Sequence, residues 1–345
     1  MTSLSDRDRP RATMREVAAL AGVSLKTVSR VVNDESGVSP EVRGRVTAAV
    51  RRLDYRPNLA ASNLRRTGAR TGLVGALVQD VSNAFSAGLL RSLEDAARSR
   101  HTAVLAASLD EAADREQEIV HDLVTRRVDG LVLMPATERQ DYLQAELRAG
   151  TPVVFVDRAP SGVAGDAVTV DNALGARKAV EHLFDRGHTR VAGLFHLARV
   201  PTARDRFAGY GSAHAERGVG VDPRLVVLGL SSAEEAERAV HGLLDLDDPP
   251  TAVFAGRNIL TEGAVRALRD RGLQHTVALV GFDDFPLADL LDPGISVVRQ
   301  DVGRIGAVVA ERLFARIDGD PEPPVHLVVD TEVVPRGSGE IRPAG

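Results

Sequence analysis

From residue 71 onward, short apolar runs alternate with longer stretches of helical periodicity. Helical stretches of about 12–17 residues separate the apolar runs, for example 111–127, 174–186 and 259–271. This alternation predicts parallel sheets covered by helices on both faces. The candidate strands form two sets and so predict two similar α/β subdomains: 73–78, 103–107, 130–134 and 153–156, then 191–195, 226–228, 252–255 and 277–282.

Polar residues follow several of these strands and indicate where a ligand would bind. In open α/β sheets, ligands bind beyond the carboxyl ends of the strands. Carboxylates and guanidinium groups there suit a polyhydroxylated ligand, because both make paired hydrogen bonds to neighbouring hydroxyls. A helix cap or a turn is the alternative interpretation of each aspartate. The residues concerned are Asp80, Asn83, Asp157, Arg158, Arg257, Asn258, Asp283 and Asp284.

The composition is typical of a globular chain. Its 345 residues are 43% hydrophobic and 26% charged, which is enough for two domains and a sizeable core. There is no cysteine, which excludes disulfides, thiolate metal sites and cysteine nucleophiles. No apolar run is long enough to span a membrane, and residues 1–11 lack the apolar segment of a secretory signal. We therefore expect a cytoplasmic protein with no membrane partner.

The charge is distributed unevenly along the chain. The net charge is −5, but residues 1–72 hold 14 lysines and arginines against 7 aspartates and glutamates. The remainder holds 29 basic residues against 41 acidic ones. This asymmetry suggests a polyanion partner for the N-terminal end alone, although a solvated basic surface is the alternative.

The basic N-terminal segment is predicted to form a helix-turn-helix. Thr13 and Glu16 match a capping box, and Gly22 suits the left-handed end of the helix that follows. Ser24 can cap a second helix after a turn short enough to force a sharp corner. Pro40 occupies the first position of a third helix, whose apolar residues recur at helical spacing.

The second of these helices is predicted to carry the recognition surface. Its polar side presents Leu25, Lys26, Thr27, Ser29 and Arg30. Long donors and small hydroxyls at a helix N-terminus suit base edges and phosphates in a major groove. An ordinary helical hairpin with a solvated polar face is the alternative interpretation.

Four consecutive motifs make the chain resemble the lactose-repressor (LacI/GalR) family of bacterial transcriptional regulators. They are TMREVA at 13–18, AGVS at 21–24, TVSRVVN at 27–33 and YRPN at 55–58. The resemblance implies double-stranded DNA with a pseudo-palindromic operator as partner, and a homodimer that places two heads on two half-sites. It also implies an α/β core like that of periplasmic binding proteins, with a ligand cleft between two doubly wound subdomains.

The resemblance assigns roles in DNA binding residue by residue. Leu25 and Lys26 fall where family members read bases, and Arg30 matches a further major-groove contact. The segment 58–66 matches the hinge helix, in which Leu64 wedges open a base step in the minor groove. A helix of about eight residues is marginal by itself in water, so it is expected to order on DNA. The full expected set is Ser24, Leu25, Lys26, Thr27, Ser29, Arg30, Asn33, Tyr55, Asn58, Ala61 and Leu64.

In the core, the resemblance implies an effector site. Arg206 lies in a segment that matches the family's effector-gripping arginine, and a sugar is the favoured ligand. Arg257 replaces an asparagine common in the family and adds a positive charge, which suits a carboxylated or phosphorylated sugar unless Arg257 pairs with Asp283. Ser86 and Ser231 replace aromatic residues of some members, so a purine is not expected. The expected effector residues are Asn83, Phe85, Asp157, Arg206, Arg257 and Asp283.

Other chemistry is not supported by the sequence. Nine histidines are scattered, and the nearest pair, His182 and His188, straddles Gly187, so we expect no metal site and no cofactor. No nucleophile elbow or phosphate loop is present, which argues against an enzyme. A periplasmic-type sugar-binding protein would explain the core but not the basic head.

The expected domain organisation follows from these assignments. Chain crossings between the subdomains are expected near 168–170, 298–301 and 327–330. No heptad helix follows the core, so the appended four-chain assembly of some members is not expected. The predicted divisions are a DNA-binding domain at 12–56, a hinge at 57–70, a first subdomain at 71–169 with 301–328, a second at 170–300 with 329–338, and flexible tails at 1–11 and 339–345.

Overall fold

The head folds as three helices whose ends carry the predicted caps. The computed structural model describes residues 12–32, 35–56 and 70–344, and its helices in the head are α1 (Met14–Ala21), α2 (Leu25–Val32) and α3 (Pro40–Arg52). The Thr13 hydroxyl accepts from the Glu16 amide at 3.4 Å, while the Glu16 carboxylate accepts from the Thr13 amide at 2.6 Å. This arrangement confirms the predicted capping box. Gly22, at φ 64°, ends α1 in the left-handed region.

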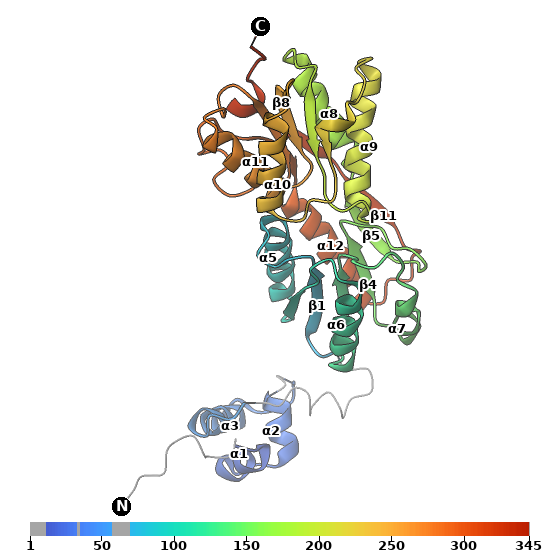
Figure 1. Cartoon of the computed structure of the whole chain (residues 1–345). Coiled ribbons are helices and arrows are strands. Elements are labelled where there is room, and N and C mark those ends of the chain that lie inside the picture. Colours follow the sequence, from blue (N-terminus) through green and yellow to red (C-terminus); the bar gives the residue numbers. More distant parts are fainter. Residues whose placement is uncertain (1–11, 33–34, 57–69, 345) are drawn as a thin grey trace, which may run out of the picture. The chain divides into compact units, whose positions relative to one another are not determined.

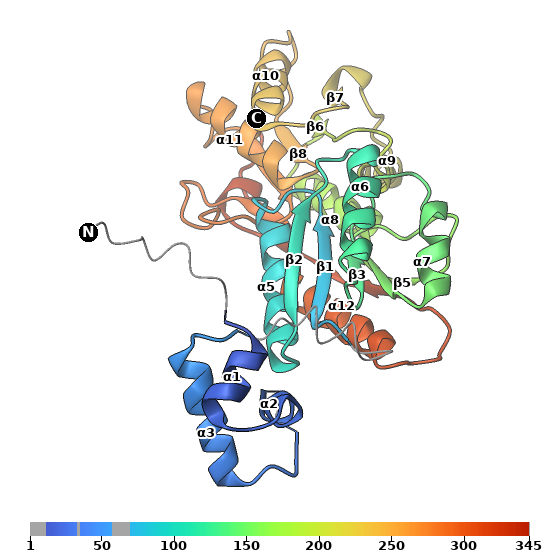
Figure 2. The same ribbon diagram turned by 90° about the horizontal axis from the view of Figure 1, so that it is seen from below.

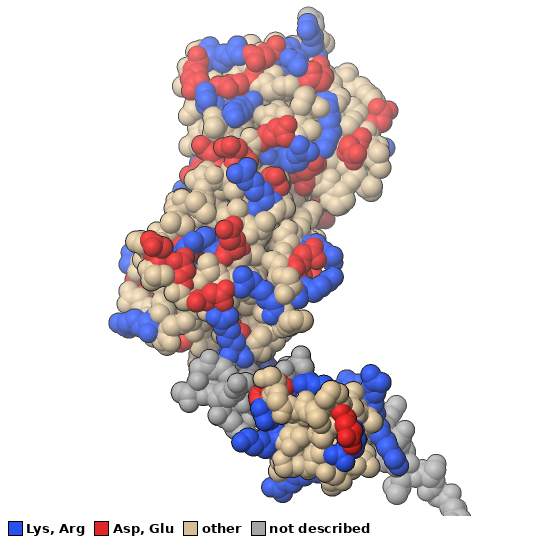
Figure 3. Space-filling view, turned by 180° about the vertical axis from the view of Figure 1, so that it is seen from behind, with Lys and Arg blue, Asp and Glu red and all other residues tan. Residues whose placement is uncertain are grey.

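A small apolar core holds the three helices of the head together. Val17, Val28 and Val46, one from each helix, are completely buried there. The Ser24 hydroxyl accepts from the Thr27 amide at 3.1 Å and so caps α2, as predicted. Figure 3 shows mainly blue charged side chains on the head, and blue and red ones interspersed on the core.

The first subdomain is a six-stranded parallel sheet with strand order β11-β5-β4-β3-β1-β2. Figure 2 shows β2, β1 and β3 side by side, with α5 next to them. Its strands are β1 (Leu73–Val78), β2 (Ala103–Ser108), β3 (Leu131–Leu133), β4 (Val153–Val156), β5 (Asp166–Val170) and β11 (His326–Val329). Its helices are α5 (Ala84–Ser99), α6 (Ala113–Thr125), α7 (Gln144–Ala149) and α12 (Val302–Ile317).

The second subdomain repeats this plan with strand order β12-β10-β9-β8-β6-β7. All its neighbouring strands are parallel except β12, which runs antiparallel to β10. The strands are β6 (Val191–Leu194), β7 (Val226–Val227), β8 (Ala252–Ala255), β9 (Ala278–Phe282), β10 (Ser296–Gln300) and β12 (Thr331–Val334). The helices are α8 (Asn172–Asp185), α9 (Pro201–Glu216), α10 (Ala233–Leu244) and α11 (Asn258–Asp270).

Apolar side chains on both faces of each sheet explain the continuous apolar runs in the sequence. In the first sheet, Val74 and Ala76 pack with α5 and α12, whereas Leu77 and Phe155 pack with α6 on the other face. The second sheet is covered by α10 and α11 on one face and by α8 and α9 on the other. The layers are visible in Figure 1, and they confirm the predicted doubly wound architecture.

Three chain segments join the two sheets. The chain passes from β5 to α8, from β10 to α12 and from β11 to β12. The strands at these crossings were not among the eight predicted ones. In β10 an exposed arginine interrupts the apolar pattern, and β11 is a short edge strand that begins with a polar residue.

Residues 339–344 differ from the expected flexible tail. Glu340 accepts from Arg186, which follows α8, with the nearest nitrogen at 2.6 Å, and its other oxygen lies 2.9 Å from Nε2 of His182 on α8. The carbonyl of Ile341 lies 2.9 Å from Nε2 of His188. These contacts hold the segment against the second subdomain. None of the helices within the described ranges is both long and apolar enough to cross a membrane.

Candidate functional site

The N-terminal turn of α2 presents its polar side chains at the surface of the head. Ser24, Leu25 and Lys26 are exposed, and Thr27 and Ser29 are half-buried. The exposed leucine is notable because 44% of its surface is open to solvent at the start of a helix. Exposed apolar and cationic groups side by side suit a DNA groove, where thymine methyl groups lie beside acceptor atoms.

Two other residues of the expected DNA-binding set, Arg30 and Tyr55, contact other parts of the head. Arg30 folds back toward the segment after α2, where its Nη2 donates to the carbonyl of Ser36 at 2.8 Å and its Nε lies 3.7 Å from Glu35. Tyr55 is only 9% exposed and belongs to the apolar core, which leaves little of its ring for contact with DNA. Asn33, Asn58, Ala61 and Leu64 lie outside the described residues.

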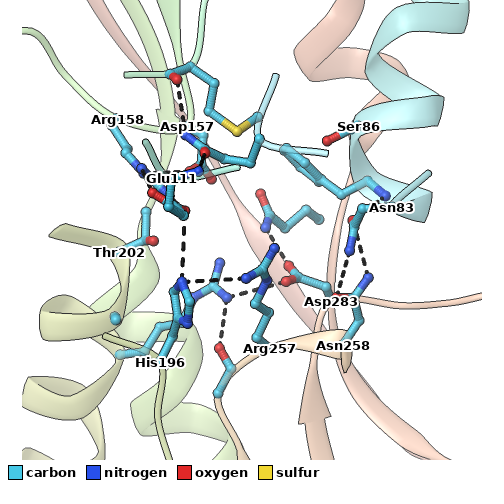
Figure 4. Close-up of a pocket in the computed structure, with 17 residues that line it drawn as sticks. Asn83, Ser86, Glu111, Asp157, Arg158, His196, Thr202, Arg257, Asn258 and Asp283 are labelled. Carbon is cyan, nitrogen blue, oxygen red and sulfur yellow. Dashed lines mark hydrogen bonds and ion pairs between the residues drawn. The ribbon is translucent and has the colours of Figure 1, made fainter. Parts of the chain in front are cut away.

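In the core, side chains from both subdomains surround a central cavity of about 50 Å³. It lies where the carboxyl ends of strands from both sheets face each other, the position expected for a ligand in this architecture. All six predicted effector residues line it. The lining is Gln79, Asn83, Phe85, Ser86, Glu111, Met134, Asp157, Arg158, His196, Thr202, Ala203, Arg206, Gly256, Arg257, Asn258, Asp283 and Gln300 (Figure 4).

Arg206 and Asp283 form a buried ion pair in the cavity. Nη1 of Arg206 donates to Oδ2 of Asp283 at 3.2 Å and to the Gly256 carbonyl at 2.8 Å, and Nε donates to Asn172 at 2.8 Å. The guanidinium carbon lies 3.7 Å from the centre of the Phe282 ring. Both side chains are about nine-tenths buried or more, so these partners fix their orientation.

A second ion pair joins Glu111 to Arg158. The two guanidinium nitrogens Nη2 and Nη1 donate to the two carboxylate oxygens at 2.5 and 2.7 Å. Burial opposes the charge on Glu111, but hydrogen bonds and charge from Arg158 and His196 outweigh it and lower its pKa to about 2. Asp157 also contacts this pair, with its Oδ2 3.3 Å from Nε of Arg158.

Contacts across the cavity connect the two subdomains. The side-chain amides of Asn83 and Asn258 exchange two hydrogen bonds, at 3.0 and 3.3 Å. On another side of the cavity, Nε2 of His196 lies 3.8 Å from Glu111, and Arg199 donates to the Glu111 carbonyl at 3.1 Å. Figure 4 shows Asn83 and Asn258 facing each other, and His196 facing Glu111.

Arg257 does not pair with Asp283, contrary to one of the sequence-based alternatives. Both oxygens of Asp283 already accept, from Arg206 and from Gln300. Among the interactions of the described residues, Arg257 makes one side-chain hydrogen bond, from Nη1 to Nε2 of His196 at 3.5 Å.

Five polar residues that line the cavity were not among the site residues predicted from the sequence: Gln79, Glu111, His196, Thr202 and Gln300. Glu111 lies after β2, His196 lies after β6 and Gln300 ends β10. The rule that located Asp157 and Asp283, a polar residue after the carboxyl end of a predicted strand, also applies to Gln79, Glu111 and His196. It does not apply to Gln300 or Thr202, because β10 was not a predicted strand and Thr202 lies on α9. Ser231, in contrast, does not line the cavity, and its hydroxyl donates to Glu235.

Comparison with known proteins gives the same division of the chain. The model for bacterial regulatory proteins of the lacI family matches residues 13–58, and the model for a periplasmic binding protein-like domain matches residues 180–339. Catabolite control protein A of Priestia megaterium is 32% identical over 307 residues, which are 88% of this chain and 92% of the relative. The chain belongs to the LacI family. It is therefore a DNA-binding transcriptional regulator and not an enzyme.

Solved structures of LacI-family proteins share the whole fold. The lac repressor dimer bound to operator and the anti-inducer ONPF superposes with a TM-score of 0.82 at 25% identity, covering 96% of this chain and 99% of that one. The transcriptional regulator CelR in complex with cellobiose has a TM-score of 0.69 at 32% identity, covering 95% and 100%. LacI-family relatives thus bind operator DNA as dimers and bind sugar effectors.

Proposed function

We propose that this LacI-family regulator is a repressor of sugar-utilisation genes whose operator affinity is changed by a small effector bound in the central cavity. The observation that carries the proposal is the convergence of buried polar groups from both subdomains on one cavity. A ligand there would replace contacts such as Asn83 to Asn258, so its binding would alter how the subdomains are held together.

The effector side of the proposal rests on Asn83, Phe85, Asp157, Arg206, Arg257 and Asp283. Arg206 and Asp283 are held in place by buried partners, so they are oriented before a ligand arrives. The cavity holds about 50 Å³, room for about four waters and less than a hexose needs. Ligand entry therefore requires the subdomains to separate or these side chains to move.

The DNA side of the proposal rests on α2 and the segment that follows the head. A homodimer would place two copies of α2 on the half-sites of a pseudo-palindrome, acting in the cytoplasm. We assign direct or phosphate contacts to Ser24, Leu25, Lys26, Thr27, Ser29, Arg30 and Asn33, and minor-groove contacts to Ala61 and Leu64. Asn58 would contact DNA next to the hinge, and Tyr55 would support the DNA-binding surface from the core of the head. The same proposal keeps the head at 12–56, the hinge at 57–70 and the core subdomains at 71–169 with 301–328 and 170–300 with 329–338.

Operator binding by the full chain tests this function. A duplex from the region upstream of the chain's own gene serves as probe, and the Leu64→Ala variant should bind it at least about tenfold more weakly, because the wedge that opens the base step is lost. Leu20→Ala is the matched control, since Leu20 is an exposed leucine of α1 outside the proposed surface, and it should bind as wild type does.

The salt dependence of the same binding supplies an independent readout. Contacts to several phosphates predict that the logarithm of the binding constant falls with the logarithm of the salt concentration with a slope of several units. Equal affinity of the Leu64→Ala and wild-type proteins would contradict the hinge assignment. A flat salt response would contradict the DNA-binding function of the head.

A further inference from the structure

Arg257 stands out in the central cavity because the lining carboxylates pair with the other two arginines and not with it. The cavity is lined by three arginines and three carboxylates, together with His196. Glu111 and Asp157 lie within ion-pair distance of Arg158, and Asp283 pairs with Arg206. No carboxylate of the described residues lies within ion-pair distance of Arg257, whose side-chain partner is a histidine nitrogen at 3.5 Å.

The tautomer of His196 strengthens this imbalance. Its Nδ1 lies 2.7 Å from the carbonyl of Leu230, which can only accept, so Nδ1 carries a proton. In the protonated ring, Nε2–H faces the Glu111 carboxylate, 3.8 Å away, and offers Arg257 no acceptor. In the neutral ring, Nε2 is an acceptor facing Nη1 of Arg257 (Figure 4). A lone pair at 3.5 Å compensates a guanidinium charge far less than a carboxylate would.

The backbone adds positive potential at the same place. Arg257 is the N-cap of α11, so the positive end of a 13-residue helix lies beside it. Burial lowers the pKa of Arg257 from its ordinary value, although the charges of Glu111 and Asp283 act in the opposite direction. The partly buried guanidinium therefore lacks some of the solvation that an anion could replace.

A second, larger cavity shares lining residues with the central one. This outer cavity of about 450 Å³ shares Glu111 and Arg158 with the central one. Three further arginines line it, Arg139, Arg199 and Arg204. The central cavity has room for a group of carboxylate or phosphate size, and the outer one has room for the body of a sugar.

We propose that the effector is an anionic carbohydrate, a sugar acid or a sugar phosphate, whose negatively charged group binds Arg257. This inference rests on the proposed function in one respect, that the central cavity is the effector site. Asp157 and Asp283, which line the central cavity, then accept from hydroxyls next to the charged group of the ligand, and Arg257 binds that charged group.

Matched ligands that differ in charge but share a carbon skeleton test the proposal. The probes are glucose, gluconate, glucuronate and glucose 6-phosphate, with the corresponding galactose series and with ribose and ribose 5-phosphate, at constant ionic strength in titration calorimetry on the full chain. At least one anionic member should bind about tenfold or more tightly than its neutral parent. Comparing the affinities of the carboxylate and phosphate members of a series shows which of the two anionic groups the site prefers.

Two variants assign the preference to Arg257. Arg257→Gln should weaken binding of that anionic member by about tenfold or more and change binding of the neutral parent by less than about threefold. Arg257→Lys keeps the charge and should retain most of the preference. Arg266→Gln removes the same charge from an exposed position of α11 and should bind as wild type does.

Three results would overturn the inference: neutral parents that bind more tightly than their anionic derivatives, anion binding that is unchanged in Arg257→Gln, or no binding by any anionic member. Operator affinity measured in parallel separates this inference from the proposed function. A neutral sugar that changes operator affinity would leave the function standing and overturn the inference. An anionic ligand that binds through Arg257 and leaves operator affinity unchanged would support the inference and contradict the proposed function.

Discussion

Asp157 and Asp283 occupy equivalent positions in the two subdomains and reach the cavity by the same backbone geometry. Asp157 follows β4 and Asp283 follows β9, with φ values of 67° and 71°. The Asp157 amide donates to the Val168 carbonyl at 3.0 Å, and the Asp283 amide donates to the Val298 carbonyl at 2.9 Å. Left-handed backbone at a residue other than glycine is uncommon and tends to mark functional positions, so this repeated turn directs a carboxylate into the cavity from each side.

The partners of these two aspartates predict unequal effects of the same substitution. Asp283→Asn leaves the buried Arg206 without its carboxylate and should lower the free energy of unfolding by about 3 kcal/mol. Asp157→Asn should cost less than about 1 kcal/mol, because burial raises the pKa of Asp157 and so already disfavours its charge. Urea denaturation of the full chain measures both. Equal losses would contradict the view that Asp283 compensates the buried charge of Arg206.

The ion pair between Glu111 and Arg158 predicts a pH-dependent contribution to stability. The folded pKa of Glu111, about 2, lies below the ordinary value of 4.5, so the contribution is complete above 4.5 and is lost as the pH falls toward 2. Glu111→Gln should lower the free energy of unfolding by about 3 kcal/mol near neutral pH, and the difference from wild type should shrink below about pH 4.5. Urea denaturation across this pH range gives the difference, and a constant value would contradict the account.

The reciprocal amide pair of Asn83 and Asn258 predicts an energetic coupling between the subdomains. Asn83 also caps α5, because its Oδ1 accepts from the Phe85 amide at 3.0 Å. Asn83→Asp keeps that cap and removes the donor to Asn258, so it tests the contact between the two subdomains without disturbing the start of α5. A double-mutant cycle of Asn83→Asp with Asn258→Ala should give a coupling of about 1 kcal/mol in unfolding free energy. A coupling near zero would mean that this contact does not hold the cavity closed.

The capping box of α1 predicts a local effect in the head. Thr13→Ala removes the hydroxyl that accepts from the Glu16 amide and should destabilise the helix by about 1 kcal/mol. Hydrogen exchange of the α1 amides in the full chain should then become about fivefold faster. Thr13→Ser keeps the acceptor and should restore protection. If the alanine and serine variants exchange alike, the cap is not what stabilises α1.

Strands with uninterrupted apolar runs could be predicted from the sequence, whereas contacts between distant segments could not. Strands buried on both faces, such as β1 and β4, were predicted at the observed bounds because every position favours apolar residues. β10 was missed because the exposed Arg299 interrupts its apolar run, and β11 because it is a short edge strand that begins with a polar residue. Arg206 was found through a family motif, but its three partners come from distant segments that periodicity does not relate. The packing of Glu340 on α8 depends on the same kind of long-range contact.

The most direct test of the central claim is the linkage between the cavity and the operator. The affinity of the full chain for its operator duplex is measured with and without the member of the sugar series that binds most tightly. The account predicts that the ligand changes operator affinity by about 5- to 150-fold, and that operator changes the affinity for that ligand by the same factor. It also predicts that Arg206→Gln binds operator but no longer responds to the ligand. A ligand that binds the cavity of the wild-type protein and leaves operator affinity unchanged would contradict the account.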